Sequence, residues 1–205
     1  MQSNCSVKRT AYRRRLPQAL DNMPSIFALI LLFVPMATTA GADHCSGLVR
    51  ADAAKAAAAN SPGFRMPLST DNLAEDVEYN ISNRGSGCLG VARGDFDGNG
   101  KQDYLIALTS RTGPGVAIVV VLRRKNGWSV ERLNELAEGR SRLFVEASPP
   151  GKYEMTQTLD VPLSEPGEVL AFTCKQSVAV FGATESSAVA YCRVGSSWQH
   201  VWISD

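Results

Sequence analysis

Histidine is scarce in this sequence: only His44 and His200 occur among its 205 residues. Because histidine is the side chain that most often carries acid–base chemistry near neutral pH, this scarcity disfavours many hydrolytic mechanisms. The serine-nucleophile motif Gly-x-Ser-x-Gly is absent as well, and no glycine-rich segment is followed by the Lys-Ser/Thr pair of a phosphate-binding loop. The sequence therefore favours a non-catalytic protein.

No apolar run is long enough for a membrane-spanning helix, which needs about 20 residues. The apolar run at residues 26–37 contains Pro35, follows a basic segment and precedes small residues at 40–42. This pattern predicts a secretory signal peptide over residues 1–42, so that the protein is periplasmic or secreted and its mature part has no stable membrane span. A retained anchor and a start at Met23 are the alternatives that stay open.

Basic residues are not in excess once residues 1–42 are set aside. The remaining 163 residues carry 16 basic and 19 acidic side chains, a net charge of about −3. Nucleic acid is therefore not an expected partner, because its binding relies on clustered positive charge. The basic cluster Arg123-Arg124-Lys125 is expected at the solvated end of a strand.

The sequence lacks the Cys-x-x-Cys pairs of common zinc sites, and Cys5 falls within the predicted signal peptide. An even number of cysteines in an exported protein predicts disulfides, and four cysteines allow three pairings. We expect Cys45 to pair with Cys88 and Cys174 to pair with Cys192, since the latter two fall in neighbouring predicted strands. Zinc is the disfavoured alternative.

One segment has an unusual density of oxygen-bearing side chains. Residues 95–103 read Asp-Phe-Asp-Gly-Asn-Gly-Lys-Gln-Asp, with acidic or amide side chains at positions 1, 3, 5 and 9 and glycine at position 6. Calcium takes about six to eight oxygen ligands, and a glycine permits the sharp turn that brings them together. The spacing predicts a calcium-binding loop, with a polar turn that binds no metal as the alternative. Residues 104–108 read as a strand, which disfavours an EF-hand.

The same loop resembles the FG-GAP repeat of integrin α-subunits and the related VCBS repeats of bacterial secreted proteins, over about residues 88–108. In that family the loop joins two strands and its calcium is structural. The resemblance implies that the side chains of Asp95, Asp97, Asn99 and Asp103 are calcium ligands. It also implies that Lys101 provides a carbonyl ligand and that the side chain of Phe96 points into the core. A single copy is present, whereas a propeller needs several repeats.

Strand patterns dominate the remainder of the mature chain. An Ala-rich segment, residues 46–60, predicts one N-terminal helix, and residues 62–87 predict a loop with a short strand near 77–81. Residues 116–122 are apolar throughout, as in a strand covered on both faces, and residues 139–152 are rich in turn formers. These patterns predict a single α+β domain over residues 43–205, mostly an antiparallel meander. A β-sandwich and a partial propeller-like sheet are the alternatives.

Aromatic side chains give a weaker functional signal. Trp128, Trp198 and Trp202 could form a patch that contacts sugars or proteins, but core packing is the favoured interpretation. His200 would share one face of its strand with Trp198 and Trp202. We expect it to be a packed strand histidine rather than a catalytic base.

Three functional hypotheses follow. The first is an exported, non-catalytic calcium-binding β-domain, in which Ca²⁺ stabilises the fold and shapes a surface for a protein or glycan partner. The second is a periplasmic inhibitor or immunity protein that acts against a cell-wall or toxin enzyme. The third is a cell-envelope hydrolase, for which paired carboxylates would have to come from segments read here as solvated loops. The carboxylates available for it are Glu154, Asp160, Glu165 and Glu168.

Overall fold

Eleven strands, two α-helices and two short 3-10 helices form the part of the chain that the computed structural model describes, residues 43–156, 163 and 165–204. The predicted signal peptide lies outside the described residues. The helices are α1 Ala51–Asn60, η1 Ser69–Asp71, α2 Ala74–Ser82 and η2 Arg140–Arg142. The strands are β1 Phe64–Arg65, β2 Val91–Gly94, β3 Asp103–Ser110, β4 Val116–Arg124, β5 Gly127–Leu136, β6 Leu143–Ser148, β7 Gly151–Glu154, β8 Ala171–Cys174, β9 Val178–Ala183, β10 Ala188–Val194 and β11 Ser197–Ser204.

The first sheet is an antiparallel meander of β2, β3, β4 and β5, and the short β1 pairs with the far end of β3. Along β4, successive side chains point to opposite faces. Ile118 and Val120 join a cluster on one face, whereas Val119 and Val121 join a cluster on the other. All four are fully buried, which confirms the prediction that residues 116–122 are covered on both sides.

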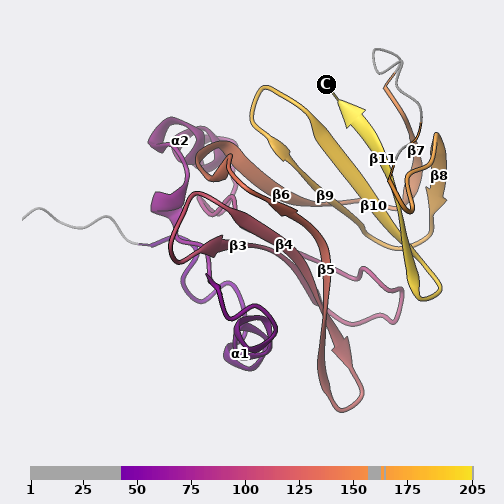
Figure 1. Cartoon of the computed structure of the whole chain (residues 1–205), viewed down its shortest axis with the longest axis horizontal. Helices are drawn as coiled ribbons and strands as arrows, with labels where there is room; N and C mark the ends of the chain where they lie inside the picture. Colours follow the sequence, from indigo (N-terminus) through magenta and orange to yellow (C-terminus); the bar gives the residue numbers. More distant parts are fainter. Residues whose placement is uncertain (1–42, 157–162, 164, 205) are drawn as a thin grey trace, which may run out of the picture. The chain divides into compact units, whose positions relative to one another are not determined.

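The second sheet is also antiparallel, with strand order β11-β10-β9-β6, and β7 pairs separately with β8. Figure 1 shows the second sheet on one side of β3, β4 and β5 and α1 on their other side. The two helices accompany a predominantly antiparallel β-structure, so the predicted α+β class is confirmed.

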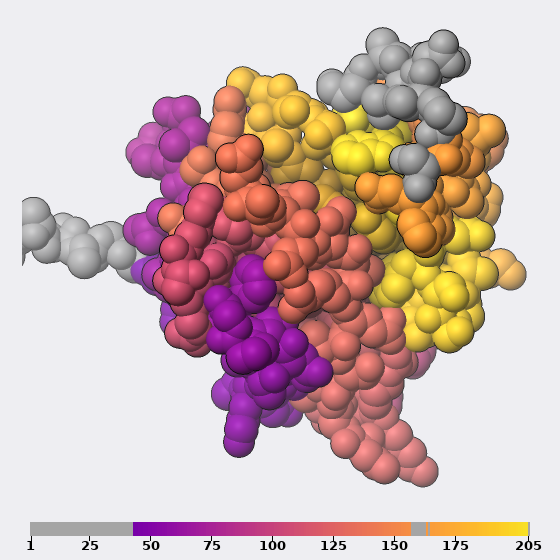
Figure 2. Space-filling view, viewed as in Figure 1, coloured from indigo at the N-terminus to yellow at the C-terminus, as the bar shows by residue number. Residues whose placement is uncertain are grey.

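Three clusters of buried hydrophobic residues lie between these layers. Phe96, Leu105 and Phe181 belong to the cluster between the two sheets. A second cluster lies between the first sheet and α1, which contributes Ala53 and Ala57. The third lies between the second sheet and the β7–β8 pair. In Figure 2, α1 is packed directly against the strands of the first sheet, as small alanine side chains at the contact allow.

The N-terminal helix starts later than expected. α1 begins at Ala51 rather than near Ser46, and the preceding residues form turns. Gly47 has a positive φ of 76°, which no residue within a right-handed helix adopts. The turn formed here brings Cys45 to its disulfide partner instead of continuing the helix.

A second helix, α2, replaces the loop and short strand expected over residues 62–87, so that prediction was wrong. Glu75 and Asp76 lie in the first turn of α2, where negative charge interacts favourably with the helix dipole. Val77 and Ile81 are one turn apart and form its apolar side. No residue of α2 is fully buried, so its apolar period in the sequence is weak.

Two disulfides link described residues, Cys45–Cys88 and Cys174–Cys192, and their pairing is the expected one. The first connects the segment before α1 to the residues before β2, and the second connects β8 to β10. Disulfides persist in oxidising compartments, so the pair indicates that the protein folds in such an environment.

Candidate functional site

The predicted metal loop connects β2 to β3, whose ends pair through Gly94 and Asp103. Gly98 and Gly100 have φ values of 73° and 74°, a conformation that favours glycine because it has no Cβ. Phe96 is fully buried in the cluster between the sheets, as the resemblance implied. The loop is therefore held by strand pairing at its ends and by one core side chain near its start.

Three carboxylates of this loop converge. Asp95, Asp97 and Asp103 each offer one oxygen, and these oxygens all lie within 4.8 Å of one another. Asp103 is fully buried, and Asp95 and Asp97 are partly buried. Three of the four predicted side-chain ligands are thus brought together in space.

Backbone N–H groups orient the two carboxylates that follow β2. Asp95 accepts hydrogen bonds from the N–H of Asn99 at 3.0 Å and from the N–H of Gly100 at 2.8 Å. Asp97 accepts a longer one from Asn99, at 3.3 Å. An ionised carboxylate has about four lone-pair sites, so these bonds leave acceptor capacity on both side chains. The donor set therefore fits a hard cation such as calcium.

Asn99 and Lys101, the remaining predicted ligands, are placed less directly. The amide oxygen of Asn99 accepts a hydrogen bond from the N–H of Lys101 at 2.8 Å, and its amide nitrogen donates to the carbonyl of Arg123 at 2.9 Å. These bonds hold the amide within the loop. A ligand role for the Lys101 carbonyl stays a prediction.

Arg124 belongs to the site although the sequence did not identify it. Its guanidinium forms a salt bridge with Asp97, whose side chain is only 3% exposed. The basic cluster at the end of β4 was expected to be solvated, but Arg124 instead lies against the acidic loop. The available signal was the presence of an acidic loop and a basic strand end in one sheet, and only the strand register shows that they meet.

Asp103 has an unusual protonation equilibrium. Burial raises the pKa of its carboxyl to about 6. Hydrogen bonds from the backbone N–H groups of Arg123 and Phe96 lower the pKa, whereas the negative charges of Asp97 and Asp95 raise it further. The N–H donors lie 2.6 and 2.9 Å from the two carboxylate oxygens. A cation beside this group would oppose the increase, because it favours the charged form.

The metal-free protein is expected to gain stability from Asp103 as the pH falls from 7 to 5. Its folded-state pKa of about 6 lies above the ordinary value of 3.8, so the folded state binds the proton more tightly and protonation stabilises it. The gain from this group over that range is about 1 kcal/mol. Urea unfolding in EGTA at both pH values measures it.

Asp103→Asn is the matched variant for this measurement. The variant is less stable at both pH values because one N–H loses its acceptor. It also lacks the carboxyl group, so the gain in stability from protonation at this position is absent. Contributions from all other groups are shared by the two proteins, so they cancel in the comparison. Equal pH dependence in the two proteins would contradict the raised pKa.

Arg124 also connects the loop to the second sheet. Its guanidinium lies 3.3 Å from Glu131 on β5. Glu131 accepts further hydrogen bonds from Arg193 of β10, at 3.1 and 3.2 Å, and from the indole N–H of Trp198 on β11, at 2.8 Å. One polar network thus extends from Asp97 in the loop to Trp198.

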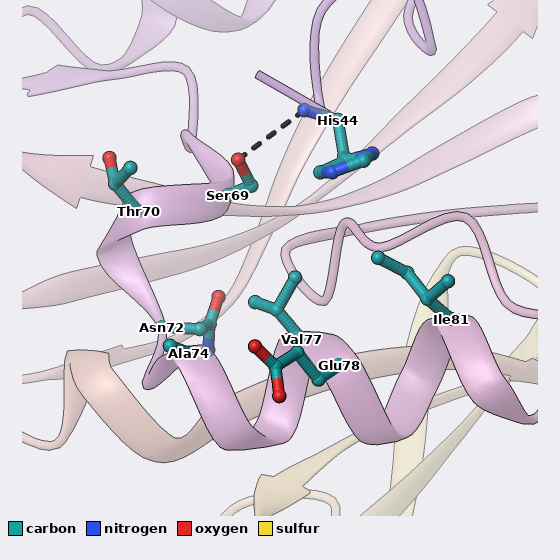
Figure 3. Close-up of a pocket in the computed structure, with 8 residues that line it drawn as sticks. All are labelled: His44, Ser69, Thr70, Asn72, Ala74, Val77, Glu78 and Ile81. Atoms are coloured by element: carbon teal, nitrogen blue, oxygen red, sulfur yellow. Dashed lines mark hydrogen bonds between the residues drawn. The ribbon is translucent and has the colours of Figure 1, made fainter. Parts of the chain in front are cut away.

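A cavity of about 440 Å³ lies beside α2. In Figure 3, Val77 and Ile81 of α2 face His44 and Ser69, and the backbone N–H of His44 donates to the Ser69 hydroxyl at 3.3 Å. None of the described residues lining this cavity has a buried polar atom without a hydrogen-bond partner. The cavity therefore gives no chemical indication of a ligand.

The three tryptophans do not share one surface patch. Trp128 packs in the cluster beside α1, with the guanidinium of Arg123 at 4.7 Å from its ring, whereas Trp198 and Trp202 pack against the cluster between the sheets. This agrees with the packing interpretation.

The carboxylates considered for a hydrolase give that hypothesis no support. Glu154 lies on β7 and is exposed, and Glu165 is exposed beside the second sheet. Glu168 is partly buried and accepts a hydrogen bond from the N–H of Glu165 at 3.1 Å. Asp160 lies outside the described residues. The hydrolase alternative stays an untested prediction.

Comparisons of the chain with family models, with curated proteins and with solved structures found no match. Within the described part of the chain, no helix has the length and apolar character that a membrane span requires. The described residues form an α+β domain with two larger antiparallel sheets, a separate two-stranded sheet, two disulfides and a triple-aspartate loop. Its function has to be argued from these features.

Proposed function

We propose that this protein is an exported, non-catalytic calcium-binding β-domain, in which Ca²⁺ stabilises the fold and supports a surface for a protein or glycan partner. The observation behind the proposal is the convergence of Asp95, Asp97 and Asp103, with ligand oxygens within 4.8 Å of one another. The two disulfides support export to the periplasm or the medium.

The charge of the loop supports a divalent cation. Among the described residues, Arg124 is the one cation paired with the three carboxylates, and it is shared with Glu131. Like charges this close repel one another unless they are neutralised or protonated. Calcium, held by the three aspartates with Asn99 and the carbonyl of Lys101, would supply that neutralisation. Binding is expected to shift Arg124 from Asp97 toward Glu131.

The position of the loop links the metal to the stability of the whole domain. The loop joins β2 to the central strand β3, and Asp103 is both a proposed ligand and the first residue of β3. Ligand binding to the folded state alone raises stability by mass action. Calcium bound here would therefore act on the central sheet and not on a peripheral hairpin alone.

Calcium is expected to raise the melting temperature of the oxidised protein by about 5–10 °C at roughly 100 times its dissociation constant, relative to EGTA. Magnesium at the same concentration is expected to give a smaller shift, because it prefers rigid octahedral sites and retains water. Differential scanning calorimetry in EGTA, Ca²⁺ and Mg²⁺ measures both shifts.

Asp97→Asn tests the assignment with almost no change of shape, and it is expected to abolish the calcium shift. Because the variant also loses its salt bridge with Arg124, the quantity compared is the difference between Ca²⁺ and EGTA within each protein. Glu154→Gln, an exposed carboxylate on β7, is the control and should keep the full shift. If calcium does not raise the melting temperature of any of these proteins, the loop is a hydrogen-bonded turn and the proposal is wrong.

A further inference from the structure

A second cavity, of about 370 Å³, opens between the two sheets on the side of β5 and β11. These strands are the terminal strands of their respective sheets. The cavity walls combine apolar and aromatic side chains with a few polar groups, which is the usual composition of a small-ligand site. Its walls include Leu133 from β5, Tyr191 from β10, Trp198 and His200 from β11, and Glu165 and Pro166.

His200 brings an unpaired hydrogen-bonding atom to this cavity. Its side chain is 5% exposed, and its Nε2 atom has no hydrogen-bond partner among the described residues. A carboxylate oxygen of Glu165 lies 3.6 Å away, too far for a hydrogen bond. Leaving a buried polar atom unpaired costs about 1–3 kcal/mol, so the atom indicates a missing partner.

Both aromatic walls are held in place. Tyr191 stacks on the imidazole of His200, with ring centroids 4.9 Å apart. The indole N–H of Trp198 donates to Glu131 at 2.8 Å. Rigid aromatic faces near a carboxylate attract cations through their π electrons.

Glu165 is the acidic residue and Arg132 the basic residue among the described residues that line the cavity. Glu165 has a side chain that is 58% exposed. The guanidinium of Arg132, although this residue also lines the cavity, is engaged by Glu135 and Ser61, which do not line it. Burial, together with the charges of Glu165 and a neighbouring glutamate, raises the pKa of Tyr191 to about 12.

We propose that this cavity binds a lysine-type alkylammonium group of a protein partner, with the ammonium between Glu165 and Nε2 of His200 and its alkyl stem against Tyr191 and Trp198. An ammonium has three donors and no acceptor, which suits a carboxylate and an imidazole nitrogen lone pair. An anion would be repelled by Glu165, and an uncharged alkyl chain would leave the buried Nε2 of His200 unpaired. The inference goes beyond the calcium proposal and does not depend on a metal in the loop.

The test is a titration of the full protein with Nα-acetyl-lysine methylamide, followed by ¹H–¹⁵N NMR of the histidine rings. The ring signals of His200 are expected to shift, whereas those of His44 are expected to stay unchanged. Nα-acetyl-norleucine methylamide, which lacks the charge, and glucosamine, which presents an ammonium on a hydroxylated ring, are the comparison ligands. Titrations in EGTA and in Ca²⁺ separate this result from the behaviour of the loop.

Glu165→Gln is expected to weaken the binding of the lysine probe about tenfold or more, because a charged hydrogen bond is lost. Glu185→Gln, at a side chain that is 80% exposed and paired with Arg142, is the matched control and should bind normally. His200→Phe keeps an aromatic ring against Tyr191 but removes Nε2, and it should also weaken binding. Unshifted His200 signals, equal binding of the norleucine probe, tighter binding of glucosamine, or unchanged affinity in Glu165→Gln would each overturn the proposal.

Discussion

Replacing Cys45 and Cys88 together by alanine is expected to lower the free energy of unfolding by about 4 kcal/mol. The two residues are separated by 43 positions, and a cross-link over a loop of that length removes much of the conformational entropy of the unfolded chain. Both cysteines are also buried in the cluster between the first sheet and α1, so their removal loosens packing there.

The second disulfide provides the matched comparison. Cys174 and Cys192 are separated by 18 positions, so their replacement by alanine is expected to cost about 3 kcal/mol. Urea unfolding of both double variants and of the reduced parent protein measures the two effects. Reduction of both disulfides in the parent protein should lower the free energy of unfolding by at least as much as the Cys45→Ala/Cys88→Ala replacement does. A loss below about 1 kcal/mol in the Cys45→Ala/Cys88→Ala protein would contradict an entropic role for this bond.

The sequence predicted the central sheet well because its signals are local. Residues 116–122 are apolar at every position, and a short run this rich in β-branched residues favours a strand that is buried on both faces. The acidic loop was also predictable from the sequence. The spacing of Asp95 and Asp97 brings them together, and the turn into β3 adds Asp103. Whether calcium occupies the loop stays a prediction.

The elements that the sequence did not predict depend on tertiary contacts. α2 has no fully buried residue. β6 lies in a stretch whose sequence predicts turns, yet it pairs with β9, whose partner residues are 30 to 40 positions further along the chain. The salt bridge between Arg124 and Asp97 depends on the register of β4 against β3. The cavity at His200 requires the relative placement of two sheets. None of these features produces a periodic pattern of apolar residues within a short stretch of the sequence.

The polar network through Glu131 gives the loop a physical connection to the second sheet. Arg124 contacts both Asp97 and Glu131, and Glu131 in turn holds Trp198, a wall of the proposed ammonium cavity. A metal that draws Asp97 away would leave Arg124 with Glu131 as its carboxylate partner. Energetic coupling between the two sites requires differential contacts of this kind. The titrations in EGTA and Ca²⁺ described above measure such coupling directly.

Phe96→Ala is expected to destabilise the protein by about 3–5 kcal/mol, as deletion of a fully buried phenylalanine does in other cores. The ring belongs to the cluster between the sheets and lies close to Gly94, where an added Cβ would come within 3.0 Å of it. Urea unfolding in EGTA gives the loss of packing without the metal. Tyr79→Ala, at an aromatic residue of α2 that is 71% exposed, is the control and should change stability by less than about 0.5 kcal/mol.

The same variant tests whether the core holds the loop in a shape that can bind a metal. Phe96 lies between Asp95 and Asp97, and its N–H donates to Asp103 at 2.9 Å, so the loss of its ring frees the segment that positions all three carboxylates. The extra stability gained on adding Ca²⁺ is therefore expected to shrink in Phe96→Ala and to remain in Phe96→Leu, which still fills much of the site. An undiminished calcium gain in Phe96→Ala would mean that the hydrogen bonds within the loop suffice to shape it, and that the buried ring acts on the core alone.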